Sequence, residues 1–68
     1  MEKMFNFSTA LYFLRSGYTI CLSLDGTTRE YFLDEEGSIQ CRVGKTTYPI
    51  KCFYVDAVMS NDWFLKNN

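Results

Sequence analysis

The chain has 68 residues, seven basic and eight acidic side chains, a net charge of −1 and no histidine. This length allows a single domain, residues 1–68. A near-neutral chain without a basic stripe argues against direct DNA binding. The lack of histidine removes the commonest metal ligand and the usual general base at neutral pH. No segment has the apolar run of a signal peptide or a membrane span, so we expect an intracellular protein that does not enter a membrane.

Cysteines and aromatic residues give two further expectations. Cys21, Cys41 and Cys52 are odd in number, show no Cys-x-x-Cys spacing and sit in apolar segments, so we predict reduced core thiols and no metal site. The chain also carries six Phe, five Tyr and one Trp. So small a domain cannot easily bury all twelve rings, and an aromatic surface left over usually marks a partner. A homo-oligomer is the expected result.

The segment FNFSTALYFLRSGY, residues 5–18, predicts a short helix. Ser8 is the expected N-cap, because its hydroxyl can accept a hydrogen bond from an amide of the first turn. Arg15 falls in the last turn, where a positive charge suits the helix dipole, and Gly17 ends the helix. The apolar positions recur at helical spacing and form one stripe: Phe7, Ala10, Leu11 and Leu14.

The segment YTICLSLDG, residues 18–26, alternates in the manner of a strand. Its apolar side chains fall on one face: Tyr18, Ile20, Leu22 and Leu24. Asp25-Gly26 is a strong hairpin signal, because both central positions of a type I′ turn need a positive φ. Residues 27–33, TTREYFL, then return as a second strand.

The remaining segments complete a small antiparallel meander. Pro49 indicates an edge strand or a bulge, because it cannot donate a hydrogen bond to a neighbouring strand. The expected elements follow in chain order: a turn at 34–37, a strand at 38–43, a turn at 44–45, a strand at 46–53, a helical turn capped by Asp56 through Met59, and a short strand at 63–65. The predicted class is α+β, a small antiparallel β-sheet meander packed with an N-terminal helix and a short C-terminal helical turn.

The sequence offers no catalytic constellation, and we predict that the protein is not an enzyme and uses no cofactor. A hydrolytic triad in its usual form needs histidine. Glu30 and the acids of residues 34–36 are interpreted as solvated turn carboxylates. The four glycines fall singly at turns and build no phosphate-binding loop.

Binding of a small anionic ligand is the chemistry that the composition favours. Aromatic rings can stack on a base, and arginine can pair with phosphate through two hydrogen bonds. The candidates for stacking are Tyr12, Tyr31, Tyr54 and Trp63, and those for phosphate are Arg15, Arg29, Arg42, Lys45 and Lys51. The alternative interpretation is that each ring belongs to the core and each arginine is solvated.

Two motifs near the ends of the chain resemble a small phage-encoded family. FSTALYFLRSGYTI is similar to a pattern F-x-x-A-L-x-x-L-K/R-x-G-x-x-V, and DAVMSNDWFL to D-I/M-L-A/S-x-D-W. The first match comprises Phe7, Ala10, Leu11, Leu14, Arg15, Gly17 and Ile20, and the second Val58, Met59, Ser60, Asp62 and Trp63. Together they cover about a third of the chain and resemble the Thoeris anti-defence 2-like family.

This resemblance implies a phage protein in the host cytoplasm that sequesters a cyclic nucleotide immune signal without degrading it. Family members bind such signals as homo-oligomers, and a relative inhibits a type II CRISPR nuclease. An alternative function is therefore direct inhibition of a host defence protein. The family's R-K-x-W segment is replaced here by Leu22-Ser23-Leu24-Asp25, so its stacking Trp is not carried over. We predict the ligand-binding residues to be Arg15, Arg29, Tyr31 and Arg42.

Asp62 and Trp63 allow two interpretations. In the structural one, the Asp62 carboxylate accepts hydrogen bonds from nearby backbone amides and Trp63 anchors the last strand onto the first helix. In the functional one, Trp63 lines a ligand or partner surface.

Overall fold

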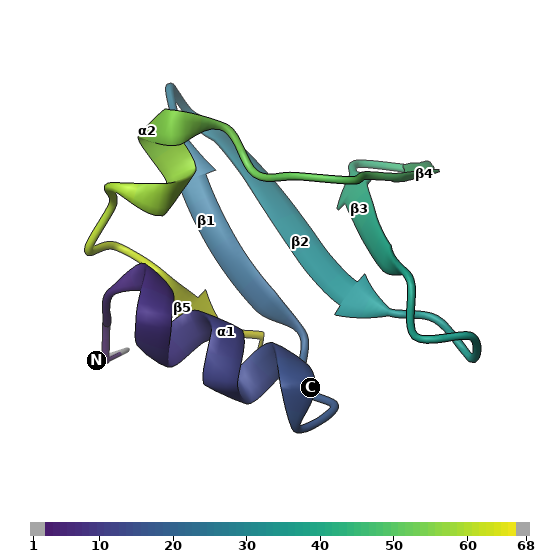
Figure 1. Ribbon diagram of the computed structural model, residues 1–68. Coiled ribbons are helices and arrows are strands. Elements are labelled where there is room, and N and C mark those ends of the chain that lie inside the picture. The colour runs from purple at the N-terminus through teal and green to yellow at the C-terminus, as the bar shows by residue number, and fades with distance from the viewer. Residues whose placement is uncertain (1–2, 67–68) are drawn as a thin grey trace.

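The computed structural model describes residues 3–66, and residues 1, 2, 67 and 68 of the predicted domain lie outside this description. The elements in chain order are α1 (Phe7–Arg15), β1 (Ile20–Leu24), β2 (Thr27–Leu33), β3 (Ile39–Val43), β4 (Thr46–Pro49), α2 (Val55–Val58) and β5 (Phe64–Leu65), as Figure 1 shows. The predicted small α+β class is confirmed.

The five strands form one antiparallel sheet in the order β4-β3-β2-β1-β5. β1 to β4 are a meander, and β5 returns to pair with the free side of β1. The β1–β2 turn is tight because Asp25 and Gly26 have φ values of 53° and 78°, as a type I′ turn requires. Pro49 lies on β4, an edge strand, as predicted.

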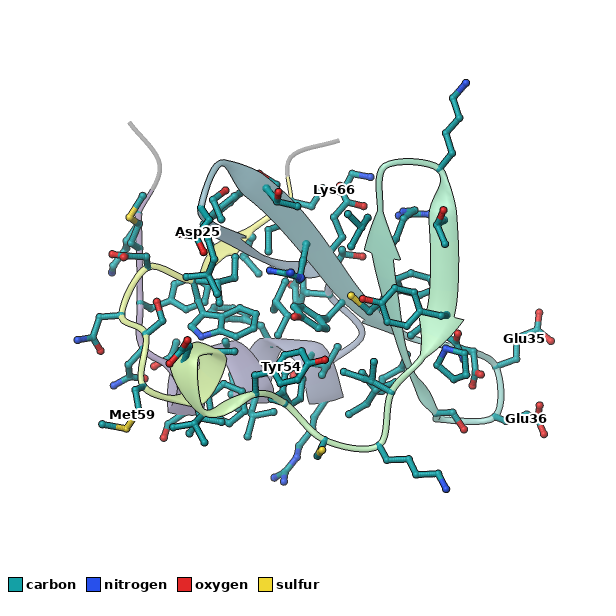
Figure 2. The ribbon with its side chains drawn as sticks, turned by 90° about the horizontal axis from the view of Figure 1, so that it is seen from above. Asp25, Glu35, Glu36, Tyr54, Met59 and Lys66 are labelled. Atoms are coloured by element: carbon teal, nitrogen blue, oxygen red, sulfur yellow. The ribbon has the colours of Figure 1, made fainter. Side chains whose placement is uncertain are left out.

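α1 and α2 lie on the same side of the sheet, and Lys66 points to the other side (Figure 2). The apolar stripe of α1 faces the sheet, with Ala10 and Leu14 buried and Phe7 and Leu11 packed at the margin of the core. Such a short helix gains its stability from this packing rather than from its own hydrogen bonds.

Trp63 occupies the centre of the core and is 0% exposed. Its indole Nε1 donates a hydrogen bond of 2.9 Å to the Ala57 carbonyl oxygen in α2. Its backbone forms an antiparallel bridge with Phe5, with N···O distances of 2.9 and 3.1 Å. Its ring lies 5.7 Å from that of Phe7 and 5.4 Å from that of Tyr31. This one residue therefore joins the N-terminal arm through its backbone, and both helices and the sheet through its side chain.

The helix caps differ from the prediction. Asn6, not Ser8, is the N-cap of α1, and its Oδ1 accepts a hydrogen bond of 2.9 Å from the Thr9 amide. α2 begins at Val55 after Tyr54, so Asp56 lies in its first turn and does not cap it. Both helices therefore begin earlier than predicted, at Phe7 and Val55.

One cysteine also departs from the prediction. Cys21 and Cys41 are buried, but Cys52 is exposed. The alternation of β4 was expected to run to residue 53, whereas the strand ends at Pro49 and the chain leaves the sheet. No helix within residues 3–66 has the length and apolar character needed to span a membrane.

Candidate ligand pocket

A cavity of about 280 Å³ lies where the chain leaves β4 and returns to α2. Residues 50–54 form one wall, and the strands β2, β3 and β4 form the other. This returning segment is visible in Figure 1 as the connection from β4 to α2. The lining comprises Arg29, Tyr31, Cys41, Tyr48, Pro49, Ile50, Lys51, Cys52, Phe53 and Tyr54.

The strand register places the floor of the pocket in one row. Tyr31 is the cross-strand partner of Cys41, and Cys41 is the partner of Tyr48. Cross-strand partners share a face of the sheet, and so do residues two apart on one strand, which adds Arg29. Tyr31 also packs against Phe53 with ring centroids 4.9 Å apart, so the returning segment rests on this row.

The two floor tyrosines keep their protons well above neutral pH. Burial raises the pKa of Tyr31 to about 12, with a further contribution from Cys41, while the charge of Arg29 opposes the shift. The pKa of Tyr48 is raised chiefly by its hydrogen bond with the Cys41 thiol. Both hydroxyls therefore stay protonated at neutral pH, where each also forms a hydrogen bond with the Cys41 thiol.

The charged side chains of the lining are both cationic. Arg29 is half-buried beside Tyr48 and Lys51 is exposed at the wall. Within residues 3–66, neither forms an ion pair with a carboxylate. Cations that lack an acidic partner in a concave site attract anions, and Arg29 presents a planar fork that matches a phosphate. Tyr54 adds a ring at the rim that is 79% exposed.

The structure brings together two of the four predicted ligand-binding residues. Arg29 and Tyr31 both line the pocket. Arg15 does not line it and is exposed in the last turn of α1. Arg42 lies on the opposite face of the sheet, because the neighbouring Cys41 faces the pocket and side chains alternate along a strand.

Arg42 belongs to a charged cluster on the helix-free face. Its guanidinium is 2.9 Å from Oε1 of Glu30, and the Lys66 ammonium is 3.2 Å from the same oxygen. Arg42 also lies over the Phe32 ring, 5.0 Å from its centroid. Burial raises the pKa of Glu30, but the hydrogen bonds and charges of Arg42 and Lys66 outweigh burial and lower it overall. Arg42 is thus engaged by its own chain.

The two residues of the C-terminal motif have different environments. Trp63 is buried and lines no part of the pocket, as the structural interpretation expects. Within residues 3–66, no backbone amide donates a hydrogen bond to the Asp62 carboxylate, so the role expected for Asp62 is not found there. Its side chain is exposed, and its backbone amide donates a hydrogen bond of 3.1 Å to the Ser60 hydroxyl.

Of the other lining residues, Lys51 and Tyr54 were candidates from the sequence but were not among the four residues predicted to bind the ligand, and Tyr48 was not a candidate. The signal for Tyr48 was nevertheless present. The alternation of the fourth strand puts Tyr48 on the same face as Ile50, and the alternation of the third strand puts Cys41 on its apolar face. In the structure, Tyr48 and Cys41 are cross-strand partners and share the face that lines the pocket. The positions of Lys51 and Tyr54 depend on the path of residues 50–54 outside the sheet, which no periodicity encodes.

Within residues 3–66, no group of three or more potential metal ligands is placed to hold an ion. Comparison with family models, with curated protein sequences and with solved structures found no match to the chain. The resemblance to the Thoeris anti-defence 2-like family therefore stays a prediction from the two sequence motifs.

Proposed function

We propose that this protein is a non-catalytic phage anti-defence protein that binds and sequesters a cyclic nucleotide-type signal. The observation that carries the proposal is the lining of the pocket, where two cations without an acidic partner adjoin three tyrosines. The resemblance of the two sequence motifs supplies the biological role, and the pocket supplies a place for the ligand.

The charges of the pocket support an anionic ligand. Arg29 is positioned to pair with a phosphate through two hydrogen bonds, and the hydroxyls of Tyr31 and Tyr48 stay protonated at neutral pH. Since no carboxylate of residues 3–66 belongs to the lining, a phosphate that enters meets no negative side chain from this part of the protein. A cation would find no oppositely charged partner in the same place.

The aromatic side chains support a ligand with a planar ring. Stacking of a base on a tyrosine contributes about 1–3 kcal/mol, whatever the base. Tyr54 offers an open ring face at the rim, and Tyr48 is partly exposed on β4. The Arg29 side supplies charge and the Tyr54 side supplies a stacking surface, which together match the two ends of a nucleotide.

The volume of the pocket constrains the size of the ligand. At about 280 Å³, the cavity lies at the small end of the range for ligand sites. One base–ribose–phosphate unit is expected to enter, and the rest of a larger cyclic signal would lie against the rim. Homo-oligomerisation would bring several such pockets into one particle.

The test is a thermal-shift panel of cyclic ADP-ribose isomers, cyclic dinucleotides and cyclic oligonucleotides, followed by calorimetric titration of any ligand that shifts the midpoint. A ligand at about 100 times its dissociation constant raises the midpoint of a domain of this size by about 10–20 °C. Recovery of the ligand unchanged from the complex, by chromatography, is expected for sequestration.

Arg29→Gln and Arg15→Gln form a matched pair of variants. Arg29→Gln removes the charge in the pocket and is expected to weaken binding roughly ten- to hundredfold, the effect of losing a charge-assisted hydrogen bond. Arg15→Gln removes the same charge from the exposed end of α1 and is expected to leave binding unchanged. A flat panel, or equal effects of the two variants, contradicts the proposal and turns attention to a protein target.

A further inference from the structure

The returning segment, residues 50–54, forms one wall of the pocket without regular structure. It runs from the end of β4 to α2 and carries Lys51 and Tyr54, a cation and a ring of the lining (Figure 1). Arg29 and Tyr31 belong to the sheet on the other side of the cavity. The separation of the two halves of the pocket therefore depends on what holds the returning segment in place.

Hydrogen bonds attach both ends of this segment to the body of the protein. At its start, the Ile50 amide donates a hydrogen bond of 3.0 Å to the Ile39 carbonyl oxygen in β3. Beyond its end, the Ala57 carbonyl oxygen in α2 accepts a hydrogen bond of 2.9 Å from the Trp63 indole. Loss of a contact in the middle of the segment leaves both attachments in place, so we expect its effect to be local.

Phe53 supplies the contact in the middle of the returning segment. Its ring lies 5.0 Å from that of Phe7 in α1 and 4.9 Å from that of Tyr31 in β2. It also meets the Trp63 ring nearly edge-on, at a centroid distance of 6.0 Å. Within residues 3–66, the neighbouring side chains of Lys51 and Tyr54 form no ion pair or ring contact of their own. Their positions therefore follow from that of Phe53.

We propose that Phe53 is a positioning residue of the ligand site, whose ring holds the returning segment against the sheet and so places Lys51 and Tyr54 for the ligand. Its effect on binding rests on the proposed function, whereas its effect on the segment does not. A ligand that enters a wall already in place does not have to order that wall. Each side chain that a ligand must order weakens binding about two- to twelvefold.

Cys41 reports on the returning segment without any ligand. It lies in the floor of the pocket between Tyr31 and Tyr48 and is 1% exposed. Cys21 is 2% exposed and is the cross-strand partner of Glu30, on the helix-free face of the same sheet. Movement of the returning segment away from the sheet uncovers Cys41 and leaves Cys21 covered, whereas global unfolding exposes both thiols.

The first experiment compares Phe53→Leu with Phe13→Leu by iodoacetamide labelling of the native protein. Phe13 is the matched control, because its ring is also partly buried against the core but lines no part of the pocket. Trypsin places the three cysteines on different peptides, residues 16–29, 30–42 and 52–66. Mass spectrometry of these peptides therefore gives the labelling rate of each thiol in one sample.

The ratio of the Cys41 rate to the Cys21 rate decides the outcome. In Phe53→Leu this ratio is expected to rise at least about tenfold above the wild-type value, because the segment opens locally. In Phe13→Leu both rates are expected to rise by a common factor, because this change lowers only the global stability. A ratio that stays at the wild-type value in Phe53→Leu overturns the proposal, since the segment then opens only with the whole fold.

The second experiment is calorimetric titration with the cyclic ADP-ribose isomer or cyclic dinucleotide that gives the wild type its largest thermal shift. Phe53→Leu is expected to weaken binding about five- to hundredfold, since the ligand must then order both Lys51 and Tyr54. Phe13→Leu is expected to keep the dissociation constant within about twofold of the wild-type value. Equal weakening by the two variants contradicts a specific role of Phe53 in the site.

A double-mutant cycle separates positioning from direct contact, because Phe53 also lines the pocket. Lys51→Gln is expected to weaken binding less in the Phe53→Leu background than in the wild type, whereas Arg29→Gln, on the sheet, is expected to have the same effect in both. Additive effects of Phe53→Leu and Lys51→Gln would mean that Phe53 acts through its own contact with the ligand, which overturns the positioning role. A wild-type protein that binds no member of the panel contradicts the proposed function instead. The ratio of the two labelling rates then still decides whether Phe53 holds the returning segment.

Discussion

Trp63 makes the contact between α2 and the rest of the core through one hydrogen bond. Its Nε1–H donates a hydrogen bond of 2.9 Å to the Ala57 carbonyl oxygen, which also accepts a longer one of 3.3 Å from the Ser60 amide. A hydrogen bond contributes about 0.5–1.5 kcal/mol net, and lost ring volume in a core adds to the cost of removing the indole. The indole therefore contributes both volume and a hydrogen bond at the point where the short α2 meets the sheet.

Trp63→Phe is expected to destabilise the protein by about 1–3 kcal/mol, since the ring of Phe fills part of the space but cannot donate to Ala57. The measurement is urea unfolding followed by circular dichroism. Val55→Ala, at an exposed position of α2, is the control and is expected to change stability by less than about 0.5 kcal/mol. Equal effects of the two changes would refute the role of the Trp63 hydrogen bond.

Glu30 gives the stability a dependence on acid pH. Its pKa in the folded protein is below the ordinary value of 4.5, because Arg42 and Lys66 outweigh the opposing effect of burial. A carboxyl whose pKa is depressed by folding stabilises the protein above its unfolded pKa, and this stabilisation disappears as the pH falls through the folded pKa. The contribution of Glu30 is therefore complete at neutral pH and lost in strong acid.

Glu30→Gln is expected to reduce stability at neutral pH and to have progressively less effect as the pH falls below 4.5. Chemical unfolding of both proteins across this pH range measures the difference. Glu36→Gln, in the exposed turn after Asp34, is the matched control. A wild-type advantage over Glu30→Gln that stays constant down to strong acid would show that the ion cluster does not titrate as proposed.

At the scale of the elements, the N-terminal cap of α1 decides where the helix begins. Asn6 and Ser8 are both good capping residues, and only the position of the Asn6 side chain, 2.9 Å from the Thr9 amide, distinguishes them. Asn6→Ala is expected to cost about 1 kcal/mol, or about 4–8 °C in the thermal midpoint. Ser8→Ala, inside the helix, is expected to be neutral or slightly stabilising. The opposite order would place the cap at Ser8.

The elements that the sequence predicted well are those whose signals are local. β2 has the predicted bounds, residues 27–33, because an Asp-Gly turn precedes it and an Asp34 turn follows it. In that second turn, the Asp34 carboxylate accepts hydrogen bonds of 2.9 Å from the amides of Glu36 and Ser38. Side chains that bond to their own backbone fix a turn without tertiary help.

The pocket was only half predictable for a related reason. Alternation along β2 and β3 settles which face Arg29, Tyr31 and Cys41 share, and the same alternation excludes Arg42. Lys51, Cys52 and Tyr54 lie on a connection without regular structure. Their positions depend on long-range packing of Phe53 against Tyr31 and Trp63, which no short-range pattern expresses.

At the scale of the whole molecule, the three thiols differ in how a reagent reaches them. One is exposed in the folded protein, and the other two become accessible only when the fold opens. Cys52 is exposed on the returning segment, whereas Cys21 and Cys41 are 2% and 1% exposed at the centre of the sheet. A reagent can reach a buried thiol only when the surrounding structure opens. In a small cooperative domain this opening approaches global unfolding.

One thiol is therefore expected to react rapidly with an aromatic disulfide reagent in the native protein, and the other two slowly, at a rate limited by opening of the sheet. In about 6 M urea, well beyond the expected midpoint of so small a domain, all three are expected to react rapidly. Cys52→Ser should remove the rapid phase and leave the slow phase unchanged. Because a pocket ligand stabilises the folded state, it should slow the reaction of Cys21 and Cys41, with a fall in the logarithm of the rate that follows the thermal shift. Three rapid thiols in the native protein would contradict a cooperative core built around β1 and β3.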